Sequence, residues 1–294
     1  MRKRFCLTVF VLLSLTAASF AAGAAFFMRD GVSAAEVAMG SAATAGTEGV
    51  NAIYWNPAGL AEMGTYGWQL SSMYQMADHD RYYGWLAAAI RTEDYGNIGL
   101  SLMAYGVSDI DLYDESGVFM ERAADAEYAA GITYSNRVNY QFRYGITARG
   151  HYQDLAGFRA VGYSVDAGVV FRPVIDRDIY AGVMIQNILG TLYWTGYGES
   201  MLTSYKAGIS GSFFEDVVKT SFDAVVEDGY SRVLFRGGAE FKVFDVLFIR
   251  GGIDDMSPAA GAGLHYQAYK FDYAFVYDRG GLGDCHLFSL ALMW

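Results

Sequence analysis

The chain contains few residues that could carry out chemistry. Histidine occurs only at positions 79, 151, 265 and 286. His151 and His265 lie in phase with charged strand residues, but neither belongs to a recognisable nucleophile motif. A Ser–His pair assembled across strands would leave no trace in the sequence. No Cys and His residues have the spacing of metal ligands, and the glycines form no phosphate-binding loop. The sequence therefore predicts no enzyme, no metal site and no cofactor.

Acidic residues outnumber basic residues. The chain has 32 Asp and Glu against 21 Lys and Arg, and its formal net charge is −11. A chain this acidic has no electrostatic basis for binding nucleic acid. Asp109, Asp111, Asp114 and Glu115 are close enough in sequence to hold a calcium ion, although a solvated acidic loop is the simpler interpretation.

The first residues are typical of an export signal. Basic residues at 2–4 precede an apolar run from Phe5 to Ala18, and small residues follow at 21–25, where a signal peptidase could cut. The run is shorter than the roughly 20 residues of a spanning helix. We expect a signal peptide at 1–22, with an uncleaved N-terminal anchor as the alternative. Cleavage would leave Cys285 without a disulfide partner.

Beyond the signal, apolar residues recur at every second position. In 270–278, Phe271, Tyr273 and Phe275 alternate with Lys270 and Asp272. A helix would mix these two sets on its surface, so the pattern predicts a strand. Either face of 82–90 could be the apolar one. Fourteen strands are expected, at 66–74, 82–90, 96–105, 127–135, 140–152, 162–171, 179–187, 204–213, 220–227, 232–242, 247–254, 259–266, 270–278 and 286–294.

This dispersal of apolar residues favours a transmembrane antiparallel β-barrel, in which alternate residues face lipid. A soluble β-sandwich is the alternative. An Arg or Lys on the lipid face of a barrel costs about 2–4 kcal/mol at the bilayer midplane, so charged strand residues should face the lumen. Their mixed signs suit a salt-bridged interior that opposes ion flow, whereas a lumen without such a network would make a small porin. They are Arg143, Arg149, Asp166, Lys206, Asp223, Arg236, Glu240, Arg250, Lys270 and Asp272.

An even number of strands places both ends of the chain on one side of the membrane. If that side is the periplasm, the outward loops include 106–126, 188–203 and 278–285, and the inward turns include 91–95, 136–139 and 267–269. The last strand ends on alternating apolar residues: Phe288, Leu290, Leu292 and Trp294. This ending resembles the signal read by the barrel assembly machinery. We therefore expect a bacterial outer-membrane protein that meets outer-membrane lipid and that machinery.

Residues 23–64 lack the alternation of a strand. Residues 34–40 could form a short helix, and 42–49 form a linker of small residues. Pro57 has no N–H and restricts Asn56 to extended conformations, while Gly59 permits a tight bend. Such a segment can fold against other surfaces without a sheet of its own. A tight turn that leads into the first strand is the simpler alternative.

Two stretches here resemble the PorV/PorQ family and, more distantly, the FadL family of outer-membrane transporters. They are Ala38-Met39-Gly40 and the run from Asn51 to Leu60, Asn-Ala-Ile-Tyr-Trp-Asn-Pro-Ala-Gly-Leu. Ile185-Gln186-Asn187 followed by Gly190 is similar to a mid-barrel element of those proteins. The resemblance implies a fourteen-stranded up-and-down barrel at 65–294 with a hatch at 23–64 inside its lumen. The hatch residues would be Ala38, Met39, Gly40, Asn51, Trp55, Asn56, Pro57, Ala58 and Gly59.

The resemblance also implies two possible functions. One is a hatch-gated transporter or channel for small hydrophobic molecules. The other is an accessory barrel of a type IX-like secretion system, with secretion proteins as partners. An apolar path through the lumen would favour the first, and a closed lumen with a protein-binding surface would favour the second. Glu36 and Glu48 are the only charges in 33–60, and we expect them to pair with Arg143, Arg149, Arg236 or Arg250, since buried charges must be paired.

Overall fold

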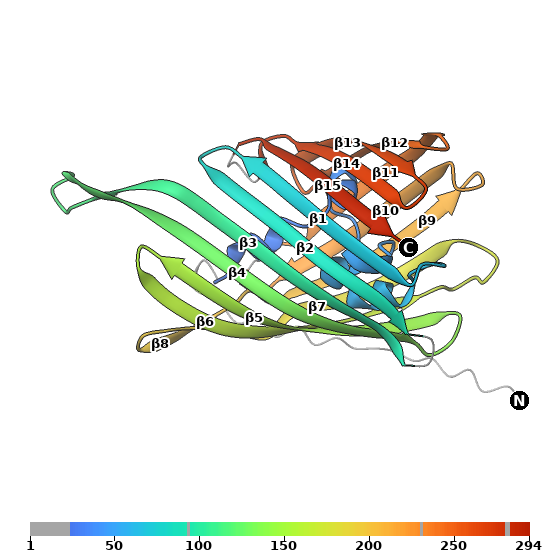
Figure 1. Cartoon of the computed structure of the whole chain (residues 1–294), viewed down its shortest axis with the longest axis horizontal. Helices are drawn as coiled ribbons and strands as arrows, with labels where there is room; N and C mark the ends of the chain where they lie inside the picture. The colour runs from blue at the N-terminus through green and yellow to red at the C-terminus, as the bar shows by residue number, and fades with distance from the viewer. Residues whose placement is uncertain (1–23, 93–94, 230–231, 280–282) are drawn as a thin grey trace, which may run out of the picture.

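The computed structural model describes residues 24–92, 95–229, 232–279 and 283–294. In this part of the chain, all strands belong to one antiparallel sheet, and pairing of β6 with β7 closes the sheet into a barrel (Figure 1). The short strand β8 pairs only with β7 as a hairpin extension, so fourteen strands form the wall. The expected fourteen-stranded barrel is confirmed. The expected signal peptide at 1–22 lies outside the described residues.

Most strand bounds lie within a few residues of the expected ones. The strands are β1 Trp68–Ala77, β2 Arg81–Thr92, β3 Gly96–Tyr113, β4 Phe119–Arg137, β5 Phe142–Leu155, β6 Phe158–Phe171, β7 Ile179–Trp194, β8 Tyr197–Ser200, β9 Ser204–Phe213, β10 Val218–Glu227, β11 Leu234–Phe244, β12 Leu247–Asp254, β13 Ser257–Tyr266, β14 Tyr269–Val276 and β15 Cys285–Met293.

The prediction of outward loops at 106–126 and 188–203 is wrong, because most of these residues belong to strands. β3 and β4 continue through most of 106–126 as a paired ribbon that projects beyond the neighbouring strands, at the left of Figure 1. Only residues 114–118 connect them, and the Asp114 carboxylate turns the chain by accepting the N–H groups of Ser116 and Val118 at 2.9 Å. Likewise, β7 and β8 occupy most of 188–203. The 106–126 stretch contains six acidic residues and little regular alternation of apolar and polar residues, so the period-2 pattern did not indicate a strand there.

The first strand, β1, pairs with the last strand, β15, in the wall. The N–H of Trp68 donates to the carbonyl of Trp294 at 2.9 Å, and the N–H of Trp294 donates to the carbonyl of Trp68 at 3.1 Å. We call this end of the barrel the terminal end and the opposite end the distal end. The connections after β2, β4 and β13 lie at the terminal end, as do the expected inward turns.

The two faces of the wall differ as the alternation predicts. Phe271 is 48% exposed on the outer face, whereas its neighbour Asp272 is 4% exposed on the lumen side. β2 is apolar on both faces, because Tyr83 and Trp85 point inward and Leu86 points outward. The inward aromatic side chains of β2 contact the N-terminal segment, which explains why its sequence did not reveal its face.

The N-terminal segment, residues 24–63, lies within the barrel and contacts the inner wall (Figure 1). It contains η1 Phe26–Arg29, α1 Ala34–Ala38, η2 Gly49–Asn51, α2 Ala52–Trp55 and η3 Pro57–Ala61. α1 packs against β12–β15, and η3 packs against β3–β6. Asn56 begins η3 by accepting the N–H of Ala58 in its side chain at 3.1 Å, with Pro57 at the first helical position. None of the described helices is long and apolar enough to cross a membrane.

Candidate functional site

The backbone of the N-terminal segment lies directly against glycines of the inner wall. Gly238 and Gly252 face each other on β11 and β12, and the backbone of Met39 and Gly40 crosses them. A Cβ atom on Gly252 would lie 2.3 Å from the Gly40 nitrogen, and one on Gly238 would lie 2.3 Å from the Met39 carbonyl oxygen. Gly40 itself has a φ of 66°, which favours glycine. Any larger residue at these wall positions would displace the segment.

A second glycine pair holds the Asn56–Pro57 corner. Gly145 and Gly168 are register partners on β5 and β6, and a Cβ on Gly168 would lie 2.0 Å from the Asn56 side-chain oxygen. The Asn56 amide nitrogen donates to the carbonyl of Thr44 at 2.8 Å. It also reaches the carbonyl of Val169 on β6 at 3.2 Å. Asn56 therefore joins two parts of the segment to the wall.

The position of these glycines relative to the charged residues could have shown from the sequence that they face the lumen. Gly238 is two residues from Arg236, and Gly252 is two residues from Arg250, so each shares the inward face of its strand with a lumen charge. Glycines in barrel strands are ordinarily expected to relieve crowding within the strands. Their phase relative to the charges indicates that here they make room inside the lumen.

The expected lumen charges all lie on the inner face. Eight of them are buried, and Glu240 and Lys270 are half-buried. Arg149 pairs with Asp166, and its guanidinium also donates to the carbonyl of Ile53 at 3.1 Å. Asp223 accepts the N–H groups of Ala43 and Thr44, both at 2.9 Å. These wall charges therefore hold the backbone of the N-terminal segment.

Other charges pair within the wall. Arg250 contacts Asp272 at 2.6 Å and Glu240 at 2.5 Å, and Arg236 contacts Asp254 at 2.7 Å. These pairs explain how so many charges remain in the lumen, since an unpaired buried charge is costly.

Lys206 is different, because no carboxylate of the described residues lies within ion-pair distance of it. Its ammonium group lies 5.6 Å from the centre of the Tyr54 ring. It borders a cavity of about 10 Å³, which is room for about one water molecule. The lumen is thus closely filled around this residue.

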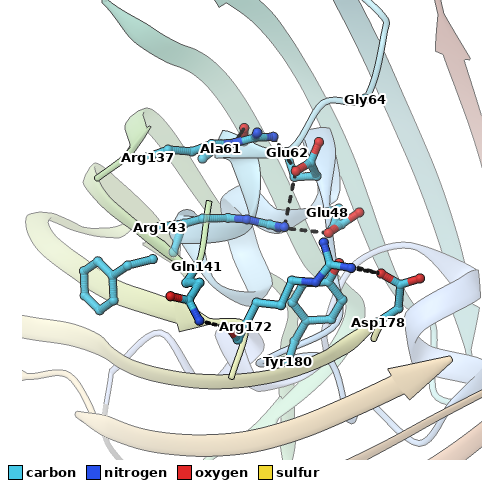
Figure 2. A network of polar contacts seen from close by, with 12 residues as sticks. Glu48, Ala61, Glu62, Gly64, Arg137, Gln141, Arg143, Arg172, Asp178 and Tyr180 are labelled. Carbon is cyan, nitrogen blue, oxygen red and sulfur yellow. Dashed lines mark hydrogen bonds and ion pairs between the residues drawn. The ribbon is translucent and has the colours of Figure 1, made fainter. Parts of the chain in front are cut away.

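A group of ion pairs connects the N-terminal segment to the wall at the terminal end (Figure 2). We call Glu48, Glu62, Arg137 and Arg143 the latch. Arg143 contacts Glu48 at 2.9 Å and Glu62 at 3.2 Å, and Arg137 also pairs with Glu62. The Arg143 guanidinium lies 5.2 Å from the centre of the Tyr180 ring. One wall residue, Arg143, therefore holds two carboxylates from different parts of the segment.

The expected pairing of Glu48 is present, but that of Glu36 is wrong. Glu36 makes no ion pair among the described residues, and its Oε2 atom is buried without a hydrogen-bond partner. Burial raises the pKa of the Glu36 carboxyl group. Arg250 is the arginine whose charge influences Glu36. Its guanidinium already pairs with Glu240 and Asp272 and does not form an ion pair with Glu36.

The N-terminal segment meets β1–β3 and β15 through apolar side chains. Tyr54 packs edge-on against Trp85 at 6.3 Å between ring centres, and Phe27 packs against Tyr83 at 6.1 Å. We call this contact the apolar seam. On the wall it contains Met73, Tyr83, Trp85, Ala87, Ala89, Met103 and Leu287, and on the segment Phe27, Val32, Val37, Ile53, Tyr54, Trp55 and Leu60.

His151 and Ser164 form the kind of pair that a nucleophile site requires. The His151 Nε2 atom lies 2.8 Å from the Ser164 hydroxyl oxygen inside the lumen. A general base must also be oriented by a third group, but the Nδ1 atom of His151 is buried without a partner among the described residues. Within the described ranges, no group of His, Cys, Asp or Glu residues is arranged to hold a metal ion.

The barrel is similar in fold to several solved structures. No family model and no curated protein matches the sequence. The toluene transporter TodX of P. putida superimposes with a TM-score of 0.69 at 12% identity, over 90% of this chain and 99% of that chain. The toluene transporter TbuX of Ralstonia pickettii gives 0.65 at 15% identity, over 90% and 99%.

A Pseudomonas aeruginosa FadL homologue gives a TM-score of 0.60 at 13% identity, over 89% of this chain and 97% of that chain. The chain has the fold of the FadL-type barrels. The PorV/PorQ resemblance and the role in secretion stay predictions, because a likeness to TodX, TbuX and the FadL homologue does not bear on them.

Proposed function

We propose that this protein is an outer-membrane channel for small hydrophobic molecules and that residues 24–63 form its hatch. The apolar seam is the observation that carries the proposal. Charged side chains of β5 and β10 hold the hatch. On β1–β3 and β15 the hatch meets the apolar seam and a few neutral hydrogen-bonding groups, those of Gln69, Asn97 and Ser289. A hydrophobic molecule can replace one apolar contact with another along this seam, while an ion would lose its hydration there. The transporters that share the fold support this choice.

The outer-membrane location is part of the same proposal. Aromatic and aliphatic side chains such as Tyr163, Phe235 and Phe271 cover the outer face of the strands, which suits lipid. The expected signal peptide would direct export. The terminal end would then face the periplasm, because the long β3–β4 ribbon at the distal end suits the cell exterior. The latch would lie on the periplasmic side of the hatch.

Removal of the hatch tests the proposal. The intact protein in planar bilayers should conduct ions at a level near zero, because the hatch fills the lumen. Deletion of residues 33–60 should produce a steady open level. Cells that carry the intact protein should take up a labelled monoaromatic hydrocarbon faster than cells without it.

Heat-modifiable electrophoretic mobility is the folding control for the deletion variant. A correctly folded deletion variant that conducts no more than the intact protein would mean that the wall residues alone close the lumen. Uptake that is the same with and without the intact protein would contradict a channel for hydrophobic molecules and leave the secretion role as the alternative.

A further inference from the structure

Four polar side chains lie along the apolar seam. They are Ser71 and Gln75 of β1 and Tyr83 and Trp85 of β2, and each is at most 3% exposed. Among the described residues, no hydrogen-bond partner exists for the Ser71 and Tyr83 hydroxyls, the Trp85 indole nitrogen or the Gln75 amide oxygen. The Gln75 amide nitrogen donates to the Cys285 sulfur at 3.8 Å, and sulfur is a weak acceptor. The seam therefore contains hydrogen-bonding groups that the rest of the described chain does not satisfy.

Three of these side chains are close enough to meet one small molecule. Gln75 and Tyr83 face each other in the register of β1 and β2, and Trp85 is the next inward residue of β2. The Cβ atoms of facing residues in an antiparallel pair lie about 5 Å apart, and successive inward residues of one strand lie about 7 Å apart. A single ring with one polar substituent can therefore reach the Tyr83 hydroxyl and the Gln75 amide together. Ser71 lies farther along the seam.

The hatch covers these side chains with rings rather than with hydrogen-bonding groups. Phe27 packs edge-on against Tyr83, and Tyr54 packs edge-on against Trp85. Nearby on the wall, Ser289 does bond the hatch, because its hydroxyl accepts an N–H of α1 at 2.6 Å. Tyr83 and Trp85 therefore remain unpaired at the places where hatch rings cover them.

Unpaired polar groups in a buried place cost free energy, and most of those in native proteins have a partner. A water molecule can bond these groups while the seam is closed. A guest molecule with a hydroxyl group repeats the bonds of that water, whereas a hydrocarbon displaces the water and leaves the groups unpaired. A site that bonds a hydroxyl group therefore discriminates strongly against the analogue that lacks one.

The donor and acceptor types at the seam select a hydroxyl group. Tyr83 and Trp85 can donate to its oxygen, and the Gln75 amide oxygen can accept its hydrogen. A charged group would lose its hydration there without gaining a counter-ion, because the side chains that form the apolar seam carry no charge. The groups at the seam thus favour a neutral guest.

We infer that the apolar seam prefers neutral molecules with a hydroxyl group on an apolar body, namely phenols and hydrophobic alcohols, over hydrocarbons of the same shape. Tyr83, Gln75 and Trp85 bond the hydroxyl group, and the hatch rings contact the apolar body. This preference names a substrate class for the proposed channel and rests on that function, although binding at the seam can be measured without transport.

Toluene and 4-methylphenol differ by one hydroxyl group and test the preference. The purified protein in nonionic detergent is titrated with each compound, and binding is followed by calorimetry. Tyr83→Phe removes a single oxygen atom from the seam. It should weaken the binding of 4-methylphenol about fivefold, the loss typical of one hydrogen bond, and should leave the binding of toluene nearly unchanged. Partition of each compound into detergent is the same for every protein variant, so it does not affect the comparison between variants.

Tyr82→Phe is the matched control. Tyr82 is the adjacent residue of β2 and is 39% exposed on the outer face, so its loss of a hydroxyl group should change neither affinity. Gln75→Leu removes the acceptor for the ligand hydroxyl. It should weaken the binding of 4-methylphenol but not that of 4-methylanisole, whose oxygen carries no hydrogen. Heat-modifiable mobility verifies the folding of each variant.

Three outcomes would overturn the inference. One is an equal loss of affinity for toluene and 4-methylphenol in Tyr83→Phe, and another is an equal effect of Tyr82→Phe and Tyr83→Phe. The third is unchanged affinity for both compounds in Tyr83→Phe, because buried water alone would then satisfy the Tyr83 hydroxyl.

The two proposals fail in different ways. Uptake of both compounds by cells that carry the protein, with a ratio that Tyr83→Phe does not change, would leave the channel and remove the preference. Binding of 4-methylphenol that depends on Tyr83, together with uptake that is the same with and without the protein, would leave the site and remove the channel function.

Discussion

Arg143 shows how a single wall residue can control the hatch. Its side chain is 6% exposed and contacts both Glu48 and Glu62, whose side chains are 42% and 24% exposed (Figure 2). An ion pair as exposed as that with Glu48 stabilises little by itself, because water and salt screen it. The buried guanidinium on the Tyr180 ring gives the network its fixed geometry. The latch therefore acts as a unit.

Replacement of Arg143 should loosen the hatch. Arg143→Gln keeps a polar, hydrogen-bonding side chain, although a shorter one, and removes the charge that holds two hatch carboxylates. We expect brief openings in planar bilayers to become roughly fivefold more frequent, equivalent to about 1 kcal/mol. Arg159→Gln is the control, because Arg159 of β6 pairs with Asp154 of β5 and makes no ion pair with the described hatch residues. Equal opening frequencies in both variants would mean that the latch does not hold the hatch closed.

At the scale of elements, close backbone approach decides how the hatch fits. A fourteen-stranded barrel is narrower than the porins that leave an aqueous channel. Paired inward glycines let short helices and turns lie on the strands themselves, as Met39 and Gly40 do on Gly238 and Gly252. The position of the hatch therefore depends on wall glycines, which leave room for its backbone, as well as on polar contacts.

Gly251 and Gly252 of β12 allow a test of whether the hatch needs close backbone approach, because only Gly252 faces the hatch. A Cβ on Gly252 would clash with the hatch backbone at 2.3 Å, whereas one on Gly251 would find only the Ala259 carbonyl oxygen at 4.0 Å. Gly252→Ala should therefore displace the hatch, with an overpacking cost of about 1–3 kcal/mol, and should raise conductance. Gly251→Ala should behave like the unaltered protein. Limited proteolysis of residues 24–63 measures hatch release, and equal protection in both variants would contradict the prediction.

The closing strand is expected to matter for assembly rather than for binding. Trp294 makes two backbone hydrogen bonds with Trp68, where β15 pairs with β1. An unclosed barrel would expose two sheet edges. Deletion of Trp294 should lower the amount of heat-modifiable protein in the outer-membrane fraction. Trp294→Phe keeps the backbone bonds and an aromatic end, so its yield should be close to normal. A normal yield of the deletion variant would refute the assembly role.

The whole molecule combines two environments that face opposite ways. Apolar side chains cover the outer face. Inside, ion-paired arginines lie on β5, β11 and β12, whereas the apolar seam lies on β1–β3 and β15. The hatch lies between these parts and contacts both. The β3–β4 ribbon at the distal end is rich in acidic residues, and the latch pairs both signs of charge at the terminal end.

The sequence by itself determined the barrel, the number of its wall strands and the face of every wall strand except β2. These properties depend on neighbours two positions apart, because lipid penalises every charge on the outer face. Asp166, Arg236 and Asp272 therefore showed their direction without a structure. β2 did not, because its inward rings Tyr83 and Trp85 pack on hatch residues that lie far earlier in the chain.

Only the tertiary structure decided which partners meet in the lumen. Glu48 reaches Arg143 across 95 positions, whereas Glu36 makes no ion pair among the described residues. Alternation gives the direction of a side chain but not its height in the barrel, which is set by register, strand tilt and the path of the hatch. Ion pairing and close packing depend on that height within a few ångströms, so they arise only when the closed wall and the hatch are in place.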